Sequence, residues 1–122
     1  VITDRFSDST KAYQGYGRGI DLGLIDYIDK SVMGMLRPDL TILLDMDVEA
    51  GLIRNRNMKK TDRLELEEIA FHERVREGYH EIQKSEPDRI KTIDASRALD
   101  EVGALIRETV LRFLKKTGLI GG

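Results

Sequence analysis

The chain has 122 residues, 40% of them hydrophobic and 34% charged, which is typical of one compact globular domain. Its formal net charge of −2 provides no general field that would attract nucleic acid or an anionic membrane, so a phosphate contact requires a local cluster of arginines and lysines. Cysteine is absent and no apolar run approaches the length of a membrane span, so we expect a cytoplasmic protein without disulfides that binds neither nucleic acid nor membranes.

The amino terminus carries neither an initiator methionine nor a signal peptide, so we interpret the chain as part of a longer polypeptide. Residues 1–3 are predicted to end a buried strand. That assignment places Asp4 and Arg5 at the carboxyl end of the strand.

Two helices are predicted next. The first covers residues 9–16, with Ser7 or Asp8 as its cap. Glycines then lead to a second helix over residues 20–33, whose apolar face is wider than a single stripe. A helix of this kind must bury its second stripe, and a partner subunit is one means of doing so.

Two short apolar runs, residues 40–44 and 90–95, predict the strands of a sheet. The first run ends at Asp45 and Asp47 and is continuously apolar, as in a central parallel strand. Further helices are expected over residues 49–57, 65–84 and 99–113, and a charged, mobile loop over residues 54–63. Strands that alternate with helices indicate an α/β fold, a parallel sheet flanked by helices.

Polar residues follow three of the predicted strands, at positions 4–5, 45–47 and 94–97. In open α/β sheets ligands bind beyond the carboxyl ends of the strands. Arg5 is the sharpest candidate among these residues, because a planar guanidinium can hold a phosphate bidentately. The alternative is a structural salt bridge with Asp4 or Asp8.

The predicted helix over residues 9–16 carries polar groups on one face: Ser9, Thr10, Tyr13 and Gln14. Hydroxyl, phenol and amide groups on one face can read the edge of a base and a sugar. The alternative is an amphipathic helix in which Tyr13 is a core residue with a solvated hydroxyl.

The ten residues of the predicted loop contain five cationic side chains: Arg54, Arg56, Lys59, Lys60 and Arg63. A polyphosphate suits such a cluster, although charge runs are also common on solvated surfaces. Asp62 and Glu65 can either cap the next helix or hold a magnesium-bound water. No glycine precedes a lysine, so the phosphate-loop pattern G-x-x-x-x-G-K-[ST] is absent.

A series of short motifs runs through the whole chain. They are Asp4-Arg5-Phe6 with Ser9, Ala12-Tyr13-Gln14-Gly15, Gly17-Arg18-Gly19, Arg37-Pro38-Asp39-Leu40-Thr41, Leu44-Asp45, Arg54-x-Arg56, Asp62-Arg63-Leu64-Glu65, Arg74-x-Arg76-x-Gly78-Tyr79 and Ile93-Asp94-Ala95. In this order and spacing they resemble the thymidylate kinase family. The resemblance implies that residues 1–122 form the carboxyl-terminal part of a single P-loop nucleoside monophosphate kinase domain, without the P-loop segment.

The activity that the resemblance implies is phosphorylation of dTMP to dTDP by ATP, with Mg²⁺ as cofactor. By similarity, Asp4 supports the magnesium ion through water and Arg5 bridges the acceptor and donor phosphates. The residues that match the thymidine pocket are Ser9, Thr10, Tyr13 and Gln14. Tyr13 is implied to lie near the deoxyribose and to disfavour a 2′-hydroxyl.

The resemblance also implies a lid over about residues 54–64, with Arg54 and Arg56 as catalytic cations. Many bacterial relatives have a third lid arginine where this chain has Met58, followed by two lysines. A lysine supplies a point charge but no bidentate fork.

Ser96 and Arg97 match the loop beside the adenine, so with Arg54 they are the expected ATP contacts. The implied partners are dTMP, ATP and a second copy of the chain, bound through the helix over residues 20–33. Two alternatives remain: a non-catalytic dimerisation or regulatory module derived from a nucleotide kinase, and a kinase for another nucleoside monophosphate.

The family's strand order gives one expectation for the fold. Residues 40–44 and 90–95 should pair directly and in parallel, whereas residues 1–3 should be separated from 40–44 by the P-loop strand. Because that strand is missing, we expect the chain alone to be unstable and inactive as a kinase.

Overall fold

The computed structural model describes residues 2–34, 36–56 and 64–119. Within these ranges the elements follow in the order α1 (Ser7–Thr10), η1 (Lys11–Gly17), α2 (Leu22–Met33), β1 (Thr41–Asp45), α3 (Val48–Asn55), α4 (Leu66–Ser85), β2 (Ile90–Asp94) and α5 (Leu99–Lys116). This is the α/β arrangement that the sequence predicts, with boundaries that differ by a few residues.

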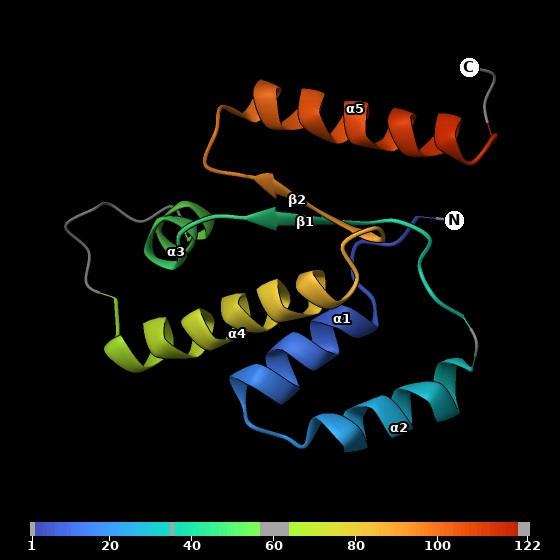
Figure 1. Cartoon of the computed structure of the whole chain (residues 1–122). Helices are drawn as coiled ribbons and strands as arrows, with labels where there is room; N and C mark the ends of the chain where they lie inside the picture. The colour runs from blue at the N-terminus through green and yellow to red at the C-terminus, as the bar shows by residue number, and fades with distance from the viewer. Residues whose placement is uncertain (1, 35, 57–63, 120–122) are drawn as a thin grey trace.

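The described elements form layers (Figure 1). Helix α5 lies over one face of the sheet, and α4 with the continuous helix α1–η1 lies over the other. Helix α2 packs on η1, on the side away from the sheet. Helix α3 follows β1 directly, so it begins at the carboxyl end of the sheet.

Strands β1 and β2 pair in parallel, with Thr41 opposite Ile90 and Asp45 opposite Asp94. The predicted direct pairing of these two segments is therefore confirmed. The register sets both aspartates at the same edge of the sheet, where a ligand of an α/β protein is expected to bind.

Residues 2 and 3 do not form the predicted end of a buried strand. Ile2 is fully exposed, and neither residue lies in a regular element. A strand needs a neighbour for its backbone N–H and C=O groups, and within the described chain β1 and β2 pair only with each other. Val1 lies outside the described residues.

The core lies between α4, η1 and the sheet. Its buried members are Ala12, Val75, Ile82 and Ile90, and partly buried side chains surround them. The apolar positions of α4 recur along one face of the helix, which is the face turned toward η1 and β2.

Glycine allows η1 and α4 to approach closely. A Cβ atom built on Gly78 would lie 2.7 Å from the Cβ of Tyr16, and one on Gly17 would lie 2.8 Å from the ring of Phe71. The sequence predicts an α-helix over residues 9–16, whereas the structure begins it as α1 and continues it to Gly17 as a π-helix.

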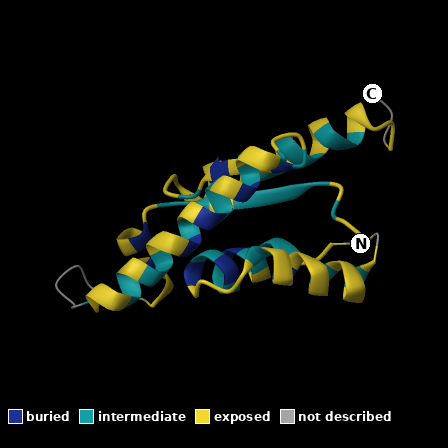
Figure 2. Cartoon of the chain, turned by 60° about the horizontal axis from the view of Figure 1, so that its bottom comes forward, coloured by how far each residue is buried: buried dark blue, intermediate teal, exposed yellow. Residues whose placement is uncertain are grey.

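Helix α2 carries the broad apolar face that the sequence predicts, and much of that face is open to solvent (Figure 2). Leu24 is 49% exposed and Val32 is 74% exposed, whereas Ile25 is buried against η1. The Asp21 carboxylate accepts a hydrogen bond from the Leu24 N–H and caps the helix, which therefore starts two residues later than predicted.

An ion-pair cluster centred on Arg89 holds the start of α1 against the sheet. The guanidinium donates to both oxygens of Asp8, at 2.9 and 3.1 Å, and to Glu86 at 2.6 Å. It also donates to the Thr41 hydroxyl at 3.0 Å. Arg89, in the turn just before β2, thereby joins α1, the residue after α4 and β1.

Candidate active site

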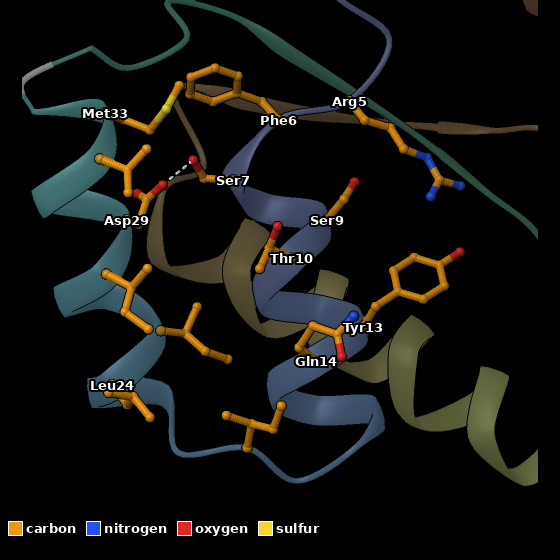
Figure 3. Close-up of a pocket in the computed structure, with 14 residues that line it drawn as sticks. Arg5, Phe6, Ser7, Ser9, Thr10, Tyr13, Gln14, Leu24, Asp29 and Met33 are labelled. Atoms are coloured by element: carbon orange, nitrogen blue, oxygen red, sulfur yellow. Dashed lines mark hydrogen bonds between the residues drawn. The ribbon is translucent and has the colours of Figure 1, made fainter.

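A groove with a volume of about 780 Å³ lies between the helix α1–η1 and helix α2 (Figure 3). Its lining includes every residue that the sequence predicts to bind substrate: Arg5, Ser9, Thr10, Tyr13 and Gln14. The predicted helical face exists because Ser9, Thr10, Tyr13 and Gln14 follow one another along a single continuous helix.

The opposite wall of the groove is apolar. Leu24, Ile28 and Val32 supply it from successive turns of α2. At one end the Ser7 hydroxyl donates to the Asp29 carboxylate at 2.5 Å, which ties α1 to α2. The groove therefore offers polar groups on one side and a flat apolar surface on the other.

Arg5 lies over the ring of Tyr13, with 5.2 Å between the guanidinium carbon and the ring centroid. The alternative of a salt bridge from Arg5 to Asp4 or Asp8 is not seen among the described residues, and both oxygens of Asp8 accept from Arg89 instead. Stacking on an aromatic face orients a guanidinium while leaving its N–H edge available for a carboxylate or phosphate.

Tyr13 is held by two further aromatic side chains. The ring centroids of Phe71 and Tyr79, both on α4, lie 6.2 Å from its own. The Tyr79 contact is edge-to-face, an orientation that aromatic pairs favour. Tyr13 therefore lines the groove and also packs against the core, which combines the two interpretations that the sequence leaves open.

Tyr79 adds a polar contact that the sequence analysis missed. Its hydroxyl lies 2.8 Å from the hydroxyl of Ser9. Burial raises the pKa of Tyr79, so the phenol is neutral across the physiological range. The available signal was a tyrosine at a core-facing helical position, since a buried phenol usually has a hydrogen-bond partner.

A second polar cluster lies at the carboxyl ends of the strands. Arg76 donates from two nitrogens to Asp45, at 3.0 and 3.2 Å, and His80 Nε2 lies 3.1 Å from the same carboxylate. Burial raises the pKa of Asp45, but the hydrogen bonds from Arg76 and His80 outweigh that effect and lower it overall. Asp45 is consequently ionised and tied to α4.

The residues predicted to contact ATP come together beside this cluster. Arg54 Nη1 donates to the Ala95 carbonyl at 2.8 Å, which brings the end of α3 to the turn that contains Ser96 and Arg97. The Ser96 hydroxyl and N–H both donate to Asp94, at 2.6 and 3.0 Å, and shape that turn.

The structure does not bring the predicted lid arginines to the groove, since none of the described residues that line it comes from α3. Arg56 is paired with Glu68 at the start of α4. The rest of the predicted loop, residues 57–63 with Met58, Lys59 and Lys60, lies outside the described residues.

Asp4, the predicted magnesium residue, is exposed at the entry to α1. No group of three or more histidine, aspartate or glutamate side chains suited to a metal ion is found among the described residues. Nor does any helix in the described ranges combine the length and apolar character of a membrane span.

The parallel sheet carries polar side chains at its carboxyl edge, where α/β proteins bind ligands, and the groove between α1–η1 and α2 is lined by a guanidinium and hydroxyls. These features define an α/β protein with two candidate ligand-binding surfaces. The family model described as "Thymidylate kinase" matches residues 1–106. The chain therefore belongs to the thymidylate kinase family, whose fold is that of the P-loop nucleoside monophosphate kinases.

Individual relatives agree with the family match. The chain is 46% identical over 118 residues to a thymidylate kinase from Gloeobacter violaceus, which covers 95% of this chain and 56% of that protein. It is 49% identical over 110 residues to one from Methylococcus capsulatus, covering 90% of this chain and 53% of that protein. The chain thus spans about half the length of the curated relatives it matches.

Proposed function

We propose that the whole protein containing this chain is a cytoplasmic kinase that transfers the terminal phosphoryl group of ATP to dTMP. One observation carries the proposal: a single groove gathers Arg5, the polar face of α1–η1 and the apolar wall of α2. A nucleoside monophosphate has an anionic phosphate, a polar sugar and a flat base, and each of these finds a complementary surface in the groove. The relatives named above carry the same activity in their names.

Arg5 has the role of holding the phosphates. Phosphoryl transfer requires little covalent help from the protein, so catalysis consists mainly of alignment and of charge stabilisation around the transferring group. The guanidinium carbon of Arg5 lies 5.2 Å from the centroid of the Tyr13 ring, and this cation–π contact holds the side chain over the ring before the substrate binds. The same ring offers bulk that would oppose a ribose 2′-hydroxyl, while Thr10 and Gln14 face the apolar wall at the position proposed for the base.

ATP is proposed to bind at the carboxyl edge of the sheet, near Arg54, Ser96 and Arg97. The contact between Arg54 and Ala95 supports this placement by joining the three residues. Mg²⁺ in kinases is commonly held by one or two carboxylates together with substrate phosphates and water. The exposed carboxylate of Asp4 fits that pattern and would hold the ion through water, lowering the charge repulsion between the phosphates.

The test is a coupled assay of dTDP formation with the whole protein, comparing the parent with Arg5→Lys. A lysine keeps the charge but loses the fork, so kcat should fall far more than KM for ATP rises. Unchanged turnover in Arg5→Lys would remove Arg5 from the catalytic residues, and a parent protein without dTMP kinase activity would refute the proposal.

The first alternative is a kinase for another nucleoside monophosphate, because the polar and apolar walls of the groove suit more than one base. Thermal-shift measurements with dTMP, dUMP, UMP and CMP would rank them, and we expect dTMP to stabilise the protein most. A non-catalytic module derived from a kinase is the other rival. It predicts no turnover of any of these nucleotides.

We also propose that the whole protein is a homodimer that uses α2. The exposed apolar side chains of that helix support an interface. Leu24, Ile28 and Val32 among them also line the groove, so the proposed interface would adjoin the nucleotide and share this apolar surface with it. Introducing a charge by Leu24→Arg or Ile28→Arg should shift sedimentation toward the monomer. A parent protein that sediments only as a monomer would exclude the dimer.

A further inference from the structure

The hydrogen bond between Tyr79 and Ser9 connects α4 to the polar side of the groove, which α1–η1 forms. The two hydroxyl oxygens are 2.8 Å apart although the residues are 70 positions apart in the sequence. Ser9 lines the groove and Tyr79 does not. Among the described residues, Ser9 and the Tyr13 ring are the groove-lining groups that Tyr79 contacts directly through a hydrogen bond or ring packing, so they connect it to a ligand in the groove.

The chemistry of the two groups sets the direction of this hydrogen bond. A phenol is more acidic than an aliphatic alcohol, and its oxygen is the weaker acceptor because a lone pair is delocalised into the ring. The favoured arrangement has Tyr79 as donor and Ser9 as acceptor. The hydrogen of the Ser9 hydroxyl is then directed away from Tyr79.

We propose that Tyr79 is a positioning residue: by donating to Ser9 Oγ, it directs the Ser9 hydroxyl hydrogen toward an oxygen atom of the nucleotide bound in the groove. The inference rests on the proposed function, since it requires a nucleotide there. Without the phenol hydroxyl, Ser9 rotates among its rotamers and can turn its hydrogen toward a backbone carbonyl of its own helix.

The tyrosine ring itself is fixed by contacts that do not involve the hydroxyl. It packs edge-to-face on Tyr13 and belongs to the layer around the buried core. Tyr79→Phe therefore removes one oxygen atom and keeps these contacts. This separates the effect on Ser9 from an effect on the fold.

The experiment is a double-mutant cycle on the whole protein, with Kd for dTMP measured by isothermal titration calorimetry. The variants are Tyr79→Phe, Ser9→Ala and the double variant. We expect Tyr79→Phe to weaken binding about three- to tenfold, the range for one hydrogen bond, and the double variant to bind no more weakly than Ser9→Ala alone. Ser9→Thr, which retains a hydroxyl, should restore the sensitivity to Tyr79→Phe.

Tyr27→Phe is the matched control. It removes the same atom from a tyrosine on α2 that is 71% exposed and is not part of the groove lining, and it should leave Kd unchanged. Should Tyr79→Phe fail to fold, 3-fluorotyrosine at position 79 replaces it. This stronger donor should tighten dTMP binding in the parent but not in the Ser9→Ala background.

Two results would overturn the inference while leaving the proposed function intact. One is an equal loss of affinity for Tyr79→Phe with and without the Ser9 hydroxyl, which would assign Tyr79 a purely structural role. The other is no loss at all. A parent protein that binds no dTMP would instead refute the proposed function, and the inference would fall with it.

Discussion

Arg89 is the residue whose loss should destabilise the protein most clearly. Its side chain is 12% exposed and donates to Asp8, Glu86 and Thr41. Burial opposes the charge of Arg89, but the hydrogen bonds that it donates to Glu86 and Asp8 outweigh that effect and raise its pKa. The guanidinium is therefore charged at every pH at which the protein folds. Its removal takes the ion-pair partner away from Asp8 and leaves Glu86 paired with Arg37 alone, at 2.8 Å.

The magnitude follows from the exposure of those anions. Removing one partner of a buried, hydrogen-bonded ion pair destabilises a protein by about 3–5 kcal/mol, much of it from the charge left behind. The side chains of Asp8 and Glu86 are 22% and 28% exposed, so water solvates part of each charge. We therefore expect Arg89→Met to lower the free energy of unfolding by about 2–3 kcal/mol, at or just below the lower limit of that range.

Chemical denaturation of the whole protein, followed by circular dichroism, measures this change. Arg112→Met on α5 is the control, because Arg112 pairs with Glu108 at 2.7 Å while its side chain is 74% exposed. An exposed pair contributes only about 0–1 kcal/mol. If Arg89→Met and Arg112→Met destabilise equally, the reasoning from burial is wrong.

Three further predictions concern the groove, the helix contact and the pH dependence of stability. Tyr13→Ala should relax sugar selection by the whole protein, because it removes the ring that we propose to oppose a ribose hydroxyl; unaltered ratios of kcat/KM for dTMP and UMP would contradict this. Gly78→Ala should lower the free energy of unfolding by about 1–3 kcal/mol in denaturant melts, because its methyl group would collide with the Cβ and ring of Tyr16. Gly103→Ala, on the exposed face of α5, is the control and should leave that free energy unchanged or raise it. Burial lowers the pKa of His72, so the folded state binds fewer protons than the unfolded one and the free energy of unfolding should fall as the pH drops below about 6.5. Denaturant melts between pH 7.5 and 5.5 measure this dependence. Over that range the free energy of unfolding of His72→Gln should fall less than that of the parent.

The sequence predicted the strands well because their signal is local. The continuous apolar run before Asp45 predicted a strand, and its parallel partner had to be the other short run, residues 90–95. The expected central position is not seen in the described chain, where β1 pairs only with β2 and Leu44 is 52% exposed. The prediction for residues 2 and 3 failed because a strand depends on a neighbour, which the local pattern cannot supply.

The candidate site was predicted in part, and the division has a physical basis. The groove-lining residues of α1–η1 could be grouped because helical spacing alone puts Ser9 and Tyr13 on the same side. Their contacts with Tyr79 depend on how α4 packs against η1, a contact between segments about 70 residues apart. The pairing of Arg76 with Asp45 could not be foreseen for the same reason, because charge alone does not choose among many possible partners.

The π-helical geometry of η1 also bears on how the length of this segment can change. In a π-helix each N–H bonds to the fifth residue before it, as Arg18 does to Tyr13, so each turn holds about one residue more than in an α-helix. Deleting one residue from η1 would let the segment close as an α-helix, with the flanking turns still joined. A deletion within α4 before Tyr79 cannot be absorbed in this way, because it rotates every later side chain by about 100° about the helix axis. Tyr79 would then no longer point toward Ser9 and Tyr13. Single-residue deletions should therefore be tolerated better in the wall of the groove than in the helix that supports it.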